Sequence, residues 1–311
     1  MIKPNRENAL WMAAGTVLMI LLFLIIFHFY QKQNPAEQLA FKASRVDLVS
    51  RVRLALASAS EAEKSAVLAT TDQDSQTFAG HARKATAEAE QARQELGELM
   101  KTGGTQGEKE LFKQFAELFI EFQRIDNNLL DLAVKNTNIK AYSLAFGPAT
   151  TALNEMNAAL SRLIALNSGS PNEKQVMLLA YSTEISGLRL QTLIPPHIAE
   201  ESDQKMNELE ALMSKEDKQI RRNLDELTVL RNLNQKANLA EAISSYARFD
   251  KIKTQILALS RENTNVKSLS ISLSQKRKVM LLCQDTLNKL QQAVLEEPIA
   301  GVTYGRPARP R

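Results

Sequence analysis

The sequence predicts an all-α protein with one N-terminal transmembrane helix followed by two antiparallel four-helix bundles in series. Three observations support this prediction. Glycine (11) and proline (9) are few among the 311 residues, whereas strong helix formers are abundant. Apolar residues recur at steps of three and four, which is typical of helices that bury one face. Polar phrases also recur at a constant offset, which indicates an internal repeat.

Composition argues against a nucleic-acid partner and against a framework of internal disulfide bonds. The formal net charge is +4, and the basic residues are mixed with acidic ones. A nucleic-acid interface would need a concentrated basic face, so no nucleic-acid partner is expected. The single cysteine, Cys283, excludes an internal disulfide framework. Because Cys283 lies in an apolar stripe, we expect it to be a small core side chain.

Residues 10–30 form an uncharged apolar run of 21 residues that predicts a transmembrane signal anchor. At about 1.5 Å per residue this run covers roughly one hydrocarbon thickness. The following QKQNPAEQ holds no small-x-small cleavage site, so an uncleaved anchor is expected. Lysine and arginine are almost equally frequent on the two sides of the run, so the charge count leaves the orientation open.

Two bundles are expected after the anchor, at residues 36–167 and 171–296. The strongest boundary signal is NSGSPNE at 167–173, and Pro195-Pro196 predicts a further break. Residues 297–311 are expected to be a disordered tail. The apolar seam of the first bundle consists of Leu111, Phe115, Leu118, Phe122, Ile125, Leu129 and Leu132. The second seam consists of Leu273, Met280, Cys283, Leu287, Leu290 and Val294, with Lys276 as an interruption.

The phrase KNTNIKAYS at 135–143 recurs as ENTNVKSLS at 262–270, an offset of 127 residues (263 − 136). Apolar positions follow the same offset, and VSRVRL at 49–54 resembles ISGLRL at 185–190 with an offset of 136. This repeat predicts a duplicated domain in which the twin phrase joins the third helix to the fourth. Asn and Thr suit either a sharp turn or a polar patch on a continuous helix. An antiparallel bundle favours the turn.

The titratable residues indicate no catalytic chemistry. The three histidines are scattered over the span, a helix and an expected loop, and His197 is predicted to be a solvated loop residue after Pro195-Pro196. No two-histidine metal spacing and no phosphate-binding glycine loop is present. We therefore expect neither an enzyme nor a metal or cofactor site.

Several segments of the sequence are similar to those of a known family of domains. After a short basic N-terminus and one apolar span comes SRVRLALASASEAEKSAVLATTD, and later LLDLAVKNTNIKAYSLAFGPATTALNEMNAALSRLIALN at 129–167. These features resemble the four-helix-bundle periplasmic sensor domain of bacterial methyl-accepting chemotaxis receptors, repeated more faintly in the second part. The resemblance implies a single-pass protein of the cytoplasmic (inner) membrane, often dimeric. Residues 1–9 would be cytoplasmic and the C-terminal region periplasmic.

The receptors of this family return through a second span to a cytoplasmic signalling part, which has no counterpart in this sequence. Any signal is therefore expected to pass to a partner, such as a membrane receptor or a kinase.

Three arginines are candidate ligand-binding residues. Val46, Val49, Arg53 and Leu56 fall at steps of three, four and three, which predicts Arg53 on the inward seam. Arg53 would then form an internal salt bridge or extend to the bundle edge. Alternatively, Arg53 and Arg51 present paired donors to a carboxylate at a helix or dimer interface. Arg189 is the repeat partner of Arg53. The resemblance adds that such receptors can hold small anionic ligands with first-helix arginines.

Two functions remain open at this point. The first is a membrane-anchored periplasmic sensory or interaction module that acts through a partner protein. The alternative is a membrane-tethered coiled-coil scaffold of an envelope or secretion complex. Polar residues on an inward seam would favour sensing, whereas an uninterrupted apolar seam with charged outer faces would favour scaffolding.

Overall fold

The computed structural model describes residues 16, 19–24, 35–231, 233–234 and 236–299, and the regular structure in these ranges is helical throughout. The predicted all-α class is therefore confirmed. Most of the predicted anchor at 10–30 lies outside the described residues. Within the described ranges, no helix is both long and apolar enough to cross a membrane.

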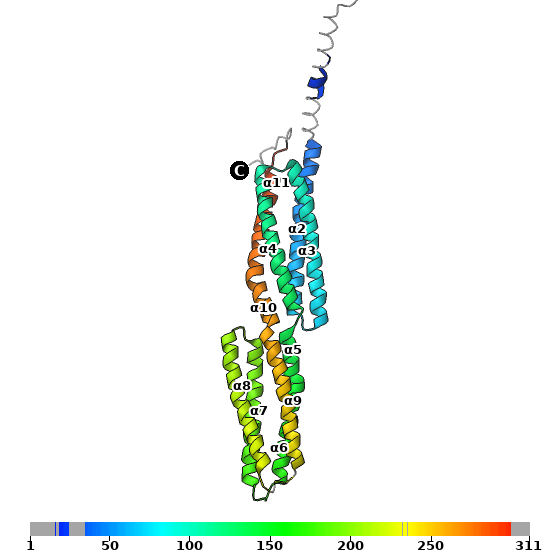
Figure 1. Cartoon of the computed structure of the whole chain (residues 1–311). Helices are drawn as coiled ribbons and strands as arrows, with labels where there is room; N and C mark the ends of the chain where they lie inside the picture. The colour runs from blue at the N-terminus through cyan, green and yellow to red at the C-terminus, as the bar shows by residue number, and fades with distance from the viewer. Residues whose placement is uncertain (1–15, 17–18, 25–34, 232, 235, 300–311) are drawn as a thin grey trace, which may run out of the picture. The chain divides into compact units, whose positions relative to one another are not determined.

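The helices follow one another with short connections (Figure 1). In chain order they are α2 (Pro35–Leu68), α3 (Asp72–Gly103), α4 (Gln106–Ala133), α5 (Thr137–Leu144), the π-helix η1 (Ala145–Ala149), α6 (Thr150–Leu166), α7 (Glu173–Ala199), α8 (Asp203–Val229), α9 (Lys236–Glu262), α10 (Thr264–Ile271), the π-helix η2 (Ser272–Lys276) and α11 (Arg277–Glu296).

Local hydrogen bonds explain where several helices begin. Before α4, the Thr105 hydroxyl accepts from the Glu108 amide at 3.3 Å, and Glu108 Oε2 accepts from the Thr105 amide at 3.1 Å. This reciprocal pair is a capping box, which satisfies amides that have no partner inside the helix. The predicted break at Pro195-Pro196 is wrong, because α7 continues to Ala199 and Ser202 caps the next helix.

The described residues form two compact units. One unit consists of the described residues within 1–57, 85–120 and 280–311, and so holds parts of α2, α3, α4 and α11. Side-chain contacts join its helices, among them Arg45 to Glu108, Arg51 to Glu95, and Arg53 to Gln291. The buried positions of α11 are spaced for a helix face: Met280, Cys283, Leu287, Leu290 and Val294. Burial of Cys283 in this stripe confirms its predicted role as a core side chain.

The other unit contains residues 58–84 and 121–279. Within it, α6, α7, α8 and α9 lie side by side around one apolar core that runs from Ala141 to Ile256 (Figure 1). Helices α6 and α7 approach closely at Gly187, where a Cβ would lie 3.2 Å from Met156 Cε. A side chain at this position would require the end of the Met156 side chain to move by a few tenths of an ångström.

The division into bundles at 36–167 and 171–296 is wrong. The core that contains Met156 and Leu163 of α6 also contains Leu190 of α7 and Phe249 of α9, so the segment 167–173 is a turn inside one core. Gly169 supplies the positive φ (76°) that this turn needs. Conversely, α11 contacts α2 through Arg53 and Gln291. The fourth helical segment of each predicted bundle therefore packs against helices of the other half.

The twin Asn-Thr-Asn phrases bind each other. Thr137 and Thr264 place their hydroxyl oxygens 3.2 Å apart, and each hydroxyl also accepts from the other residue's amide. Asn138 and Asn265 likewise exchange amide-to-side-chain hydrogen bonds, both at 3.1 Å. The phrase is thus a junction between helices, as predicted, and also a symmetrical contact between two distant parts of the chain.

The predicted reversal at this junction is wrong. Asn136 and Asn263 have left-handed backbones (φ 52° and 53°), which interrupt the helix at each phrase. However, α5 and α6 do not complete a bundle with the preceding helices of their own half. They pack against α7 and α9.

The π-helix η2 explains why two residues of the second predicted seam face the wrong way. Leu273 was expected to be inward but is 63% exposed, whereas Lys276, expected as an interruption, is buried. A π-helix inserts one residue into a helical turn and so rotates the faces that follow it. The seam of α4 is confirmed at its most buried positions, Phe115, Phe122, Ile125 and Leu129, and it also includes Phe119.

The repeat offset of 136 between α2 and α7 is not supported by burial, because Val49 is buried and Ile185 is exposed. An offset of 134 (179 − 45) matches buried positions instead. It pairs Arg45 with Leu179, Val49 with Thr183, Val52 with Ser186, Leu56 with Leu190, and Glu63 with His197.

The tail predicted at 297–311 begins with an ordered residue. Glu297 binds Arg45 through its carboxylate, and its carbonyl accepts from Lys42 Nζ at 2.8 Å. Residues 300–311 lie outside the described residues.

Candidate functional site

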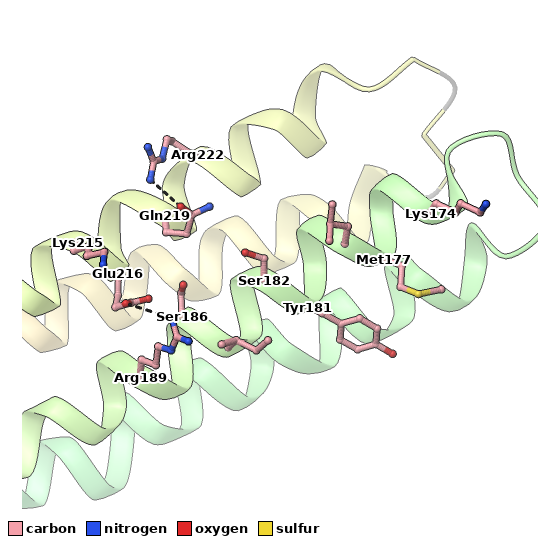
Figure 2. Close-up of a pocket in the computed structure, with 12 residues that line it drawn as sticks. Lys174, Met177, Tyr181, Ser182, Ser186, Arg189, Lys215, Glu216, Gln219 and Arg222 are labelled. Atoms are coloured by element: carbon pink, nitrogen blue, oxygen red, sulfur yellow. Dashed lines mark hydrogen bonds and ion pairs between the residues drawn. The ribbon is translucent and has the colours of Figure 1, made fainter.

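A groove of about 700 Å³ lies between α7 and α8 (Figure 2). Helix α7 supplies an apolar side, with Met177, Leu178, Tyr181 and Ile185 all substantially exposed. The groove is a candidate binding site, because ligand pockets combine apolar walls with a few polar groups that fix orientation.

The charges around the groove are predominantly positive. Lys174, Arg189, Lys215 and Arg222 line it together with one carboxylate, Glu216. Arg189 Nη1 lies 3.7 Å from Glu216 Oε1, too far for a hydrogen bond, and the Arg189 side chain is 66% exposed. Figure 2 shows these two side chains directed toward one another, and Arg222 directed toward Gln219. The Arg189 donors are therefore largely available to an anion.

The spacing of α7 places these groups on one face. Lys174, Tyr181, Ile185 and Arg189 follow one another at steps of seven, four and four residues, so they project on the same side of the helix. Ser182 and Ser186 lie further toward the core, with Ser186 buried. The groove thus has apolar and hydroxyl-bearing surfaces below a positively charged rim.

The two other candidate arginines belong to the other unit and are occupied by polar partners. Arg51 forms an ion pair with Glu95 at 3.1 Å, with both side chains nearly half exposed. Arg53 donates to Gln291 Oε1 at 2.7 Å. The prediction that Arg53 lies on the inward seam is wrong, because Val49, Val52 and Leu56 form the buried face and Arg53 is exposed. Arg53 instead lines a smaller cavity of about 290 Å³ with Ser50, Leu54, Ala57 and Gln284.

The buried arginine of α2 is Arg45, which the sequence analysis did not select. Its guanidinium binds Glu108 and Glu297 and lies 4.8 Å from the centroid of the Phe41 ring. A sequence signal for its partner was present, because Glu108 is the last residue of the capping box that begins at Thr105.

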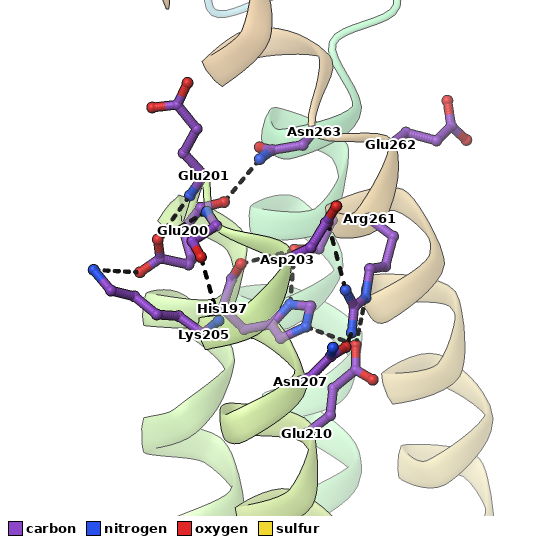
Figure 3. A network of polar contacts seen from close by, with 12 residues as sticks. His197, Glu200, Glu201, Asp203, Lys205, Asn207, Glu210, Arg261, Glu262 and Asn263 are labelled. Carbon is purple, nitrogen blue, oxygen red and sulfur yellow. Dashed lines mark hydrogen bonds and ion pairs between the residues drawn. The ribbon is translucent and has the colours of Figure 1, made fainter.

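His197 is fully buried, so the prediction of a solvated loop histidine is wrong. Because α7 continues past its two prolines, His197 reaches the inward face after Leu190 and Ile194. Its Nδ1 lies 2.8 Å from Ser260 Oγ, and its Nε2 lies 2.8 Å from Glu210 Oε1. Figure 3 shows the imidazole held between α8 and α9.

Glu210 links this histidine to Arg261, whose Nε donates to Glu210 Oε1 at 2.8 Å. The pKa of Glu210 is lowered, because the hydrogen bonds to Arg261 and then His197 outweigh the partial burial that raises it. An ionised carboxylate only accepts hydrogen bonds, so His197 Nε2 carries the proton in this contact. The network ties α7, α8 and α9 together.

A second polar cluster lies around η2. Lys276 is almost fully buried and binds Asp126, and its Nζ lies 3.5 Å from the centroid of the Phe122 ring. Glu63 is fully buried nearby, and neither of its carboxylate oxygens has a hydrogen-bond partner among the described residues. Burial raises the pKa of Glu63, whereas Ser272 and Lys276 act in the opposite direction. The sequence feature that could have indicated this cluster is Lys276, which interrupts the apolar seam of the second half.

No group of three or more histidine, cysteine, aspartate or glutamate side chains is placed to hold a metal ion in the ranges that the structure describes. The arrangement of the groove suits the binding of an anion by positive and apolar side chains.

The regular structure of the described residues is helical throughout, and α7 and α8 line a groove. A family model described as a four-helix-bundle sensory module for signal transduction matches residues 50–175. The predicted resemblance is therefore confirmed for residues 50–175. The match does not extend over 176–296, so a duplicated domain stays a prediction. No curated protein matches the chain.

Proposed function

We propose that the protein is a membrane-anchored sensory module, not an enzyme, and that its α7–α8 groove binds a small anionic molecule with an apolar part. The groove carries this proposal, since four cationic side chains and one carboxylate surround apolar side chains in a space of about 700 Å³. The family match supports the sensory class.

The anchor and the location are part of the same proposal. The apolar run 10–30 supports a single span in the cytoplasmic membrane, with residues 1–9 in the cytoplasm and the region after the span in the periplasm. The described part of this run is helical and exposes apolar side chains from Met19 to Leu24. A signal would pass to a membrane receptor or kinase partner.

Among the three candidate arginines, Arg189 is the most available to a ligand. Its guanidinium approaches Glu216 no closer than 3.7 Å, whereas Arg51 and Arg53 are hydrogen-bonded to Glu95 and Gln291. A ligand carboxylate can therefore engage Arg189 through two parallel hydrogen bonds, while an apolar chain contacts Tyr181 and Ile185. Binding by Arg51 or Arg53 stays a weaker alternative within the same function.

The test is a thermal-shift and calorimetric screen of the full chain in detergent against amino acids and small mono- and dicarboxylates. A compound that binds the folded state should raise the unfolding temperature. The Arg189→Ala variant should lose the response. Arg124→Ala is a matched control, because its side chain is equally exposed (66%) and outside the groove. Loss of binding in Arg53→Ala and not in Arg189→Ala would place the ligand elsewhere.

The alternative function is a membrane-tethered scaffold of an envelope or secretion complex. The observation that favours it is the exposure of four large apolar side chains on one face of α7, since such a face is suited to a protein partner. If no compound in the screen stabilises the chain, while a protein partner binds this face, the scaffold replaces the ligand sensor.

A further inference from the structure

Helix α7 exposes an apolar stripe along its outer face. Leu178, Tyr181, Ile185 and Leu188 are 71%, 50%, 50% and 54% exposed. They follow one another at steps of three, four and three residues. This spacing is that of the a and d positions of a coiled coil, which bury one another between two helices.

The same face of α2 shows that the fold does not require this stripe. With the offset of 134 residues that aligns the buried positions, the four stripe residues correspond to Ser44, Asp47, Arg51 and Leu54. All four are exposed in α2, and three of them are polar or charged. The apolar character is therefore particular to α7 and indicates a contact made by this helix alone.

The residue types favour a parallel pair of helices. If Leu178 and Ile185 occupy a positions, then Tyr181 and Leu188 occupy d positions. A β-branched residue at a with leucine at d favours a two-stranded, parallel coiled coil. Ile185 and Leu188 form such a layer pair at the centre of the stripe.

The flanking charges agree with this orientation. Glu184 precedes an a position on the side of α6, where its carboxylate lies 3.4 Å from the Ser161 hydroxyl. Arg189 follows a d position on the side of α8, near Glu216. In a parallel pair, a residue before a faces the residue five positions later on the other helix, so Glu184 meets Arg189 of a second copy. An antiparallel pair would bring Glu184 to its own like charge.

We propose that α7 pairs in parallel with α7 of a second copy of this chain, through Leu178, Tyr181, Ile185 and Leu188 and two reciprocal Glu184–Arg189 ion pairs. The stripe shares Leu178, Tyr181, Ile185 and Arg189 with the groove. Occupancy of one therefore changes the affinity of the other by linkage. The pairing itself does not require a ligand in the groove.

The test is disulfide cross-linking of the full chain in detergent, with Cys283 replaced by alanine. In a parallel pair each a or d residue lies opposite itself, so Ile185→Cys and Leu188→Cys should each form covalent dimers under mild oxidation. The matched control is Leu54→Cys, which has the corresponding place on α2 and is 71% exposed. The control should remain monomeric at the same protein concentration.

Charge reversal provides a second readout by analytical ultracentrifugation. Glu184→Arg and Arg189→Glu should each lower the dimer fraction several-fold, and the double exchange should restore it. Circular dichroism checks that each variant is folded, which is expected because the stripe is exposed. Equal cross-linking at 54, 185 and 188 would overturn the proposal. So would cross-linking of 185 to 188 with no self-pairing at either, or a double exchange that rescues nothing.

Discussion

The segments around the two Asn-Thr-Asn phrases share a backbone but differ in what they bury. In each, an asparagine with left-handed φ is followed by an eight-residue helix, a five-residue π-helix and then another α-helix. The offset is 127 residues (263 − 136) throughout. In η1 the buried residues are Ala145 and Ala149, whereas in η2 the corresponding residues are Ser272 and Lys276.

This difference shows that the backbone of the junction does not depend on one kind of core. Alanines fill the face of η1, while η2 buries a lysine that pairs with Asp126 beside the buried Glu63. What the two segments share is the polar contact between the phrases themselves. The common contact therefore sets the local backbone, and the neighbouring helices decide which side chains fill each face.

The largest expected effect is on the buried ion pair of η2. Lys276→Ala leaves Asp126 buried without its counter-charge, and such a change typically costs about 3–5 kcal/mol. Urea unfolding of the full chain, followed by circular dichroism, measures the loss. Lys278→Ala is the control, because Lys278 is exposed two residues away. Equal effects of the two substitutions would show that Lys276 is not buried.

The next effect is on the contact between the phrases. Asn138→Ala removes donors to the Ile198 carbonyl and to Asn263 Oδ1, and an acceptor for the Asn265 amide. Leaving such buried groups unpaired costs about 1–3 kcal/mol. Asn265→Ala, at a less buried position, should cost less. Because the two side chains share hydrogen bonds, the double variant should lose less than the sum, and strict additivity in urea unfolding would contradict the paired contact.

A smaller effect depends on pH. The pKa of Glu63 is raised above its ordinary value of 4.5, chiefly by burial. The folded state then holds this proton more tightly than the unfolded state, so the contribution is fully present below the ordinary pKa. It is lost as the pH rises through the folded pKa. Glu63→Gln should abolish this decline and increase stability at neutral pH, whereas exposed Glu61→Gln should change neither. The measurement is the free energy of unfolding between pH 4 and 8. An equal decline with pH in the parent and in Glu63→Gln would contradict the raised pKa of Glu63.

The smallest effect is expected for the exposed arginines of α2. Arg51→Ala and Arg53→Ala should change stability by no more than about 0.5 kcal/mol, since exposed ion pairs and surface hydrogen bonds contribute little. Arg45→Ala, which removes a buried guanidinium, should cost several times as much. Thermal unfolding of the three variants measures the order, and a large loss in Arg53→Ala would restore the predicted inward position.

Much of the helical organisation was predictable from the sequence. Stripes such as Phe115, Phe122 and Ile125 mark a buried face directly, and the repeated phrase marks a junction between helices. The packing partners of each helix were not predictable. An apolar stripe predicts that one face of a helix is buried, but it does not indicate which other helix covers that face. Chain order suggested that α6 closes a bundle with α2, α3 and α4.

One of the three candidate arginines lies in the groove, and its role in binding stays a prediction. Arg189 was selected by its repeat relation to Arg53, and it lines the groove. The misses have local physical causes. The π-helix rotated Leu273 outward and Lys276 inward, and the persistence of α7 through two prolines brought His197 into the core. The polar phrases predict a chain reversal, whereas Asn136 and Asn263 only interrupt the helical path.

The most direct test of the exchange of fourth segments compares two fragments of the chain. Residues 137–262 contain α5 to α9 and the whole apolar core from Ala141 to Ile256. Residues 36–167 follow the sequence boundary, but they lack α11 and include α6 without its partners α7 and α9. The measurement is the cooperativity of thermal unfolding of each fragment, followed by circular dichroism.

If the fourth segments are exchanged, residues 137–262 will be helical and unfold in one cooperative transition, whereas residues 36–167 will unfold gradually or aggregate. A cooperative 36–167 fragment together with an unfolded 137–262 fragment would contradict the exchange and restore the two bundles in chain order.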